Sequence, residues 1–125
     1  MRAGEFLALM AAGYLMTITV ETAVLWVGLS RRHPPSVRLA AGVWLTACTY
    51  PVVWIVLPPL FASRWQYLLV AETFAPVAEC ALFWLAFVRG APPRPAATVR
   101  DMAAVAGANL ASFAFGELLA AAGWW

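Results

Sequence analysis

Four long apolar runs dominate the sequence and leave little room for anything else. They cover residues 5–29, 39–60, 66–88 and 101–123, with short loops between them. A transmembrane helix needs about 20 mostly apolar residues, so each run is long enough to cross a bilayer. Of the 125 residues, 64% are hydrophobic and 11% are charged, which is too apolar for a soluble core of this size. We therefore predict an all-α polytopic membrane protein in which residues 1–125 form a single domain of four transmembrane helices.

The arginines are distributed unevenly between the two ends of this predicted bundle. Loops 30–38 and 89–100 carry three arginines each, whereas the opposite side carries only Arg2 and Arg64. Because positive residues accumulate in cytoplasmic loops, both long loops are predicted to be cytoplasmic and both termini to lie outside. Asp101 follows the second long loop at a position typical of a helix N-cap.

The sequence also contains an internal similarity. ETAVLW at 21–26 matches ECALFW at 79–84, and an arginine and a proline pair follow both motifs at the same spacing. This pattern is typical of one helical hairpin used twice in the same orientation, with a pseudo-two-fold axis along the membrane normal. Chance similarity between apolar segments is the alternative. If the hairpin is duplicated, the first residues of the two motifs, Glu21 and Glu79, are equivalent positions.

Polar residues inside the predicted spans are the strongest functional signal. A charged group in a span costs roughly 3 kcal/mol or more, so an intramembrane carboxylate needs a partner or a function. With a rise of about 1.5 Å per residue, Glu21, Glu79 and Asn109 lie roughly 3–5 Å from the span centres, on the predicted cytoplasmic side. Glu72 and Glu117 lie about 7–8 Å from the centres on the outer side. The intramembrane polar residues are therefore predicted to form two layers.

Two prolines interrupt the predicted helices next to these layers. Pro76 lies between Glu72 and Glu79, which are seven residues apart and share a helix face. A proline cannot donate a backbone hydrogen bond to the carbonyl four residues earlier, so Pro76 and Pro51 are predicted to kink their helices and free two acceptors.

Two interpretations of the carboxylates stay open at this point. In the first, each acid is protonated and hydrogen-bonds a neighbouring helix, with Thr49 and Ser112 among the available partners. The protein is then a small integral membrane subunit or scaffold in a homo-oligomer or a larger membrane complex. In the second, the glutamates titrate or coordinate in turn, as in a proton- or cation-coupled transporter or channel. Since no lysine or arginine is expected inside the membrane, ionised acids would need a cation or another subunit.

Other functions lack the residues they require. The net charge of +2 is too small for a nucleic-acid footprint, and no catalytic motif is present. His33, the single histidine, is interpreted as a solvated loop residue, so no haem or histidine-containing metal site is predicted. Cys48 and Cys80 are interpreted as small buried hydrophobic residues. The sequence identifies no cofactor, and a bound pigment, quinone or lipid would leave no recognisable pattern.

Several segments resemble a family that is known only by its architecture. They are ETAVL at 21–25, TYPVVW at 49–54, the Glu72 and Glu79 pair, and NLASFAFG at 109–116. Together they resemble a group of uncharacterised small bacterial four-span integral membrane proteins. The resemblance implies residence in a bacterial inner (cytoplasmic) membrane and implies no activity. The expected partners are the lipid bilayer and either further copies of the chain or other membrane subunits.

Overall fold

The computed structural model describes residues 1–124 of the chain, and all of its regular structure is helical. The elements in chain order are α1 (Ala3–Gly28), α2 (Pro35–Pro51), η1 (Val52–Val56), η2 (Pro58–Leu60), α3 (Arg64–Phe83), η3 (Trp84–Val88) and α4 (Pro95–Ala121). The short elements η1 and η3 are π-helical turns that extend α2 and α3, and η2 is a 3₁₀ turn. Four helices are long and apolar enough to cross a membrane, which confirms the predicted fold class.

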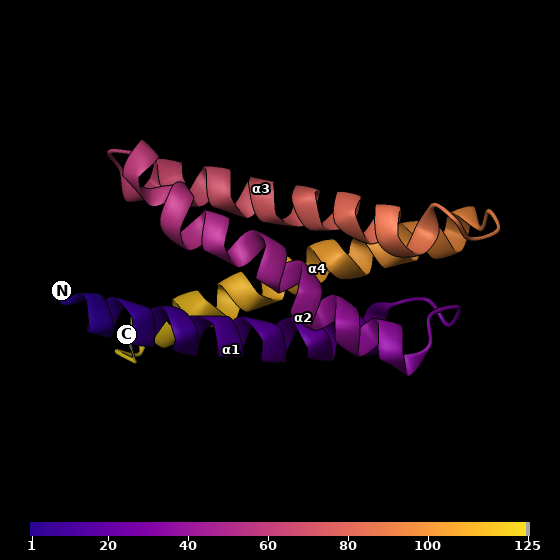
Figure 1. Ribbon diagram of the computed structural model, residues 1–125, viewed down its shortest axis with the longest axis horizontal. Coiled ribbons are helices and arrows are strands. Elements are labelled where there is room, and N and C mark those ends of the chain that lie inside the picture. The colour runs from indigo at the N-terminus through magenta and orange to yellow at the C-terminus, as the bar shows by residue number, and fades with distance from the viewer. Residues whose placement is uncertain (125) are drawn as a thin grey trace.

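The four helices form a bundle with two distinct ends (Figure 1). Both termini and the turn between α2 and α3 lie at one end, which we call the termini end. The α1–α2 and α3–α4 loops lie at the other, which we call the loop end. α1 packs against α2 and α4, and α3 packs against the same two helices. The α1–α4 and α2–α3 pairs move apart toward the termini end (Figure 1).

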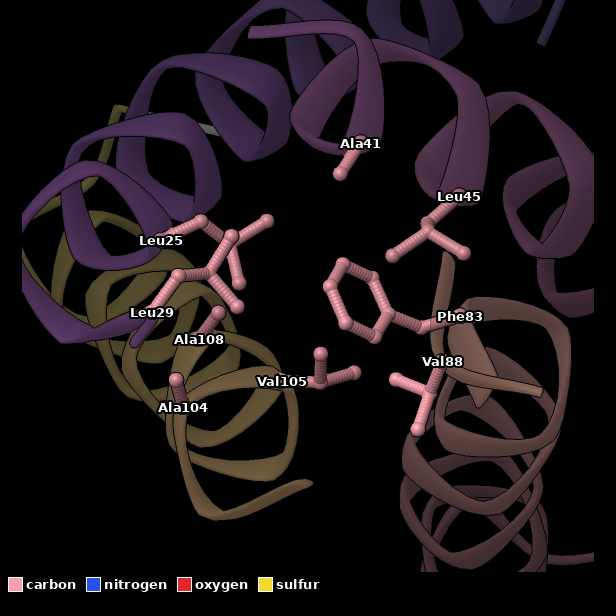
Figure 2. Close-up of a cluster of buried hydrophobic side chains, with 9 residues drawn as sticks. All are labelled: Leu25, Leu29, Ala41, Leu45, Phe83, Val88, Ala104, Val105 and Ala108. Carbon is pink, nitrogen blue, oxygen red and sulfur yellow. The ribbon is translucent and has the colours of Figure 1, made fainter. Parts of the chain in front are cut away.

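The apolar core lies near the loop end. Nine buried side chains form one cluster, which we call the loop-end core (Figure 2): Leu25, Leu29, Ala41, Leu45, Phe83, Val88, Ala104, Val105 and Ala108. The Phe83 ring points into its centre, with residues of all four helices around it (Figure 2). Such a contiguous cluster fixes the helices relative to one another through burial and dispersion contacts.

Small residues allow two close helix contacts. A Cβ at Gly42 would collide with the side chain and backbone of Thr22, so a glycine is required where α2 crosses α1. A Cβ at Gly28 would lie 3.0 Å from the Cβ of Ala104 on α4. Gly107, Gly116 and the alanines at 103, 104, 108 and 111 give the fourth span a small-residue face, and part of that face, at Ala104, packs inside the bundle. Gly107 has no atom within 4 Å of its potential Cβ, so that part of the face stays uncovered.

Two expectations about the loop end are wrong. α4 begins at Pro95 and has Arg94 at its N-cap, so Asp101 lies inside the helix instead of capping it. A proline suits the first helical position because its φ is already helical and its missing N–H is not needed there. His33 is 6% exposed and contacts Asp101, so it is a buried structural residue.

Candidate functional site

A cavity of about 410 Å³ lies between the helices in the termini half of the bundle. Its wall carries four of the six acidic residues of the chain. The polar lining residues include Thr17 and Glu21 of α1, Thr46, Thr49 and Tyr50 of α2, Arg64, Tyr67, Glu72 and Glu79 of α3, and Asn109, Ser112 and Glu117 of α4. The intramembrane glutamates therefore converge on one space from three helices, with a single arginine among them.

Glu21 is the deepest acid contributed by α1. Its side chain is buried, and Thr46 Oγ1 on α2 donates to Oε2 at 2.7 Å. Ser112 Oγ on α4 donates to Oε1 at 2.8 Å. The carboxyl group thus joins α1 to both of its neighbours.

Glu79 occupies the corresponding place on α3. Thr49 Oγ1 on α2 donates to its Oε1 at 2.5 Å, and Asn109 Nδ2 on α4 donates to its Oε2 at 2.7 Å. Like Glu21, Glu79 is buried and has one donor from α2 and one from α4. Buried polar groups are stable in an apolar bundle only when their hydrogen bonds are made, and here each carboxyl oxygen has a donor.

The outer pair of glutamates, Glu72 and Glu117, lies closer to the termini end and differs from the inner pair. Arg64 Nη2 donates to Glu117 Oε1 at 2.8 Å, with side chains 67% and 41% exposed. The carboxyl group of Glu72 is half-buried in the cavity wall and has no hydrogen-bond partner among residues 1–124. The sequence predicts no cation near these acids, yet Arg64 supplies one because it starts α3 at the edge of the bundle and its long side chain reaches α4.

Aromatic side chains line the cavity near the termini end. The Tyr50 and Trp54 rings are stacked with centroids 5.5 Å apart, and both line the cavity. Tyr50 Oη donates to the carbonyl of Met10 on α1, and Tyr67 Oη donates to the carbonyl of Val53. These hydrogen bonds fix the positions of the two tyrosine rings through their hydroxyl groups.

The two prolines have different positions in their spans. Pro51 ends the α-helical part of the second span, and the π-helical turn Val52–Val56 follows it. Pro76 lies within the continuous helix α3, between the inner and outer acids of that helix. Thr46 and Thr49 also bond carbonyls of their own helix, a contact that bends helices.

The loop-end core closes the cavity on its other side. In each helix an apolar core residue follows the inner polar residue by one helical turn toward the loop end: Leu25 after Glu21, and Phe83 after Glu79. On α4, which runs the other way, Val105 precedes Asn109 by one turn. The lining also includes the partly exposed Arg64 and Glu117 at the termini end, so the pocket has its mouth there. Its other side meets the packed apolar layer shown in Figure 2.

A second polar cluster lies beyond that layer and is centred on Asp101, which is 0% exposed. Arg32 donates to Asp101 Oδ2 from Nη2 at 2.7 Å, and His33 Nε2 lies 2.8 Å from the same oxygen. The backbone N–H of Ser30 donates to Oδ1 at 2.7 Å. Through these buried hydrogen bonds the carboxylate connects the α1–α2 loop to α4.

The Asp101 cluster was not predicted from the sequence. Asp101 lies 68 to 71 residues from its partners along the chain, so no local pattern connects them. The only available signal is the position of an acid beside two arginine-rich loops.

No protein-family model, curated protein or solved structure matches this chain. Among residues 1–124, no group of three or more His, Cys, Asp and Glu side chains is arranged to hold a metal ion. Cys48 is exposed on the bundle surface, contrary to expectation, and Cys80 is partly buried.

Proposed function

We propose that this chain is a proton- or cation-coupled transporter or channel in which the cavity is the access path. The observation that carries the proposal is the convergence of Glu21, Glu72, Glu79 and Glu117 on one cavity that opens at the termini end. Acids inside a membrane span are rare and typically mark ion pathways or proton relays. One arginine against four acids leaves the cavity with a deficit of positive charge that a cation or protons would balance.

The orientation of the path follows from the arginines. The loop end carries six of the eight arginines, so the positive-inside rule favours a cytoplasmic loop end and an outward-facing cavity. Because the loop-end core blocks the cytoplasmic side, passage requires a second state in which that core opens. Pro51 and Pro76 lie in the two helices that separate from α1 and α4, where a missing backbone hydrogen bond makes bending easier.

The inner acids also support the proposed duplication of a helical hairpin. In each half, the glutamate of the first helix receives a donor from the second helix of the same hairpin: Thr46 for Glu21, and Asn109 for Glu79. It receives its other donor from the opposite hairpin: Ser112 for Glu21, and Thr49 for Glu79. The two pairs of equivalent donors are both 63 residues apart. This arrangement is what a pseudo-two-fold axis along the bundle would produce.

A second candidate function is a structural subunit of a homo-oligomer or a larger membrane complex. It is favoured by the uncovered small-residue surface at Gly107 and by Leu110 beside it, which is 59% exposed. Intact-mass measurement of the complex, extracted from its native membrane in mild detergent, tests it. Stable foreign subunits in the measured mass would favour a role in a larger complex, a homo-oligomer would favour the homo-oligomeric form of this role, and a lone chain would argue against both.

Flux through proteoliposomes tests the transport proposal. Purified protein is reconstituted with a dye inside that is sensitive to protons, to sodium or to potassium, and the dissipation of an imposed gradient of each ion is followed with the matching dye. We expect a dissipation rate that rises with protein content for at least one of these ions. Rates equal to those of protein-free vesicles for every ion and both gradient directions would overturn the proposal.

A further inference from the structure

Two threonine hydroxyls lie between an inner carboxyl group and a carbonyl of their own helix. Thr46 Oγ1 is 2.7 Å from Glu21 Oε2 and 2.9 Å from the carbonyl oxygen of Gly42. Thr49 Oγ1 is 2.5 Å from Glu79 Oε1 and 3.2 Å from the carbonyl oxygen of Leu45. The same arrangement, a hydroxyl between a glutamate oxygen and a helix carbonyl, thus occurs twice on α2, at positions three residues apart.

Each of these threonine hydroxyls has one proton and two neighbouring acceptors. A hydroxyl group has one proton to donate and lone pairs to accept with, so each threonine can serve only one of its two acceptors at a time. If the carboxyl group is ionised, the threonine donates to it. If the carboxyl group is protonated, it donates to the threonine oxygen, and the threonine turns to its helix carbonyl. Both states leave the buried groups hydrogen-bonded, so neither has the large penalty of an unpaired buried polar group.

We infer that Glu21 and Glu79 are proton-exchange sites whose protonation is accommodated by rotation of the Thr46 and Thr49 hydroxyls. This inference rests on the proposed transport function and names the proton as the ion that the inner layer handles. Uptake transfers one proton from cavity water to one carboxyl oxygen, and the only bonds that change are O–H bonds. The helices need not move for the exchange itself.

The second oxygen of each inner carboxyl group also has a donor, of a different kind at the two sites. Asn109 Nδ2 has two protons, one for Glu79 Oε2 and one for the Val105 carbonyl. Ser112 Oγ donates to Glu21 Oε1 and also lies 3.0 Å from the Asn109 carbonyl. At Glu79 the Asn109 amide therefore stays a donor while the Thr49 hydroxyl reverses, whereas at Glu21 both donors are hydroxyls and either one is able to reverse.

Other titratable or charged groups line the same cavity and contribute to its proton equilibrium. They are Tyr50 from α2, Arg64, Tyr67 and Glu72 from α3, and Glu117 from α4. Glu72 has no hydrogen-bond partner among the described residues and lies two turns from Glu79 toward the mouth. It is placed to pass protons between outside water and the inner pair.

Infrared spectroscopy of the protein in lipid nanodiscs tests the inference. The carboxylic C=O bands of protonated glutamates are followed as the pH is changed from about 4 to about 10, the range over which carboxyl groups in proteins titrate even when strongly perturbed. We expect reversible pH-dependent bands, one absent in E21Q and another absent in E79Q. T49V should displace the pH midpoint of the Glu79 band by about one unit or more, since a hydrogen bond to a charged group is lost. T49S keeps the hydroxyl and should leave the midpoint unchanged.

The outcomes separate this inference from the transport proposal. Inner-glutamate bands that stay constant throughout the pH range would overturn proton exchange, even if proteoliposomes conduct sodium or potassium. A Glu79 band unaffected by T49V would overturn the role of the threonine. Conversely, titrating bands in a protein without flux for any ion would leave proton exchange intact and overturn transport.

Discussion

Replacing Asp101 by Asn is expected to lower the free energy of unfolding by about 3–5 kcal/mol, the usual cost of removing one partner from a buried ion pair. The asparagine keeps the shape of the aspartate, removes its charge and replaces one acceptor oxygen by an NH2 donor. Arg32, whose side chain is 9% exposed, would then be a buried cation without its counter-charge. The bonds from the Ser30 backbone and from His33 would also weaken, since hydrogen bonds to charged acceptors are the stronger ones. The α1–α2 loop should lose its attachment to α4.

Thermal unfolding in detergent, followed by circular dichroism, measures this effect. E117Q is the matched control, because it removes the charge of the exposed ion pair with Arg64. Exposed pairs contribute at most about 1 kcal/mol, so E117Q should unfold close to the wild-type temperature. Equal unfolding temperatures for D101N and E117Q would contradict the structural role given to the Asp101 cluster.

Replacing Glu79 by Gln is expected to abolish proton flux while leaving the fold intact. A glutamine can keep the local contacts: its carbonyl accepts from Asn109, and its amide donates to Thr49, which then bonds the Leu45 carbonyl. It cannot take up or release a proton. Flux in E79Q proteoliposomes should therefore fall to the level of protein-free vesicles, and E21Q should behave similarly.

The control for these variants is E5Q. Glu5 is exposed at the start of α1 and does not line the cavity, so E5Q should conduct like the wild type. Size-exclusion chromatography and circular dichroism establish that each variant is folded. Full flux in folded E79Q would contradict a proton relay and favour carboxyl groups that serve only as interhelical hydrogen bonds.

Hydropathy alone predicts the four helices, because a bilayer requires long apolar segments whose backbone groups are bonded within the helix. Counting residues along each helix also predicts that Glu21, Glu79 and Asn109 share a depth, and the structure brings Asn109 into contact with Glu79. Which donor meets which acid could not be predicted. That pairing depends on how each helix is rotated about its axis, and the low amphipathicity of apolar spans gives no signal for rotation.

Sequence patterns could predict neither the cavity nor the Asp101 cluster, for different reasons. The cavity exists because the α1–α4 and α2–α3 pairs diverge toward the termini end (Figure 1), and crossing angles depend on contacts such as that between Gly42 and Thr22. The buried position of His33 depends on Asp101, which is distant in the sequence. Its loop context wrongly suggested a solvated residue.

The central claim is that the glutamates face a water-accessible cavity that opens at the termini end. It is tested most directly by thiol accessibility of E72C in a background in which Cys48 and Cys80 are replaced by alanine. We predict that a membrane-impermeant maleimide labels E72C when it is added from the termini side, and not when it is added from the loop side. V77C, at a position 64% exposed on the outer surface of α3, should stay unlabelled because it faces lipid, where the reactive thiolate does not form. An E72C thiol that is labelled from neither side, or only from the loop side, would contradict the account.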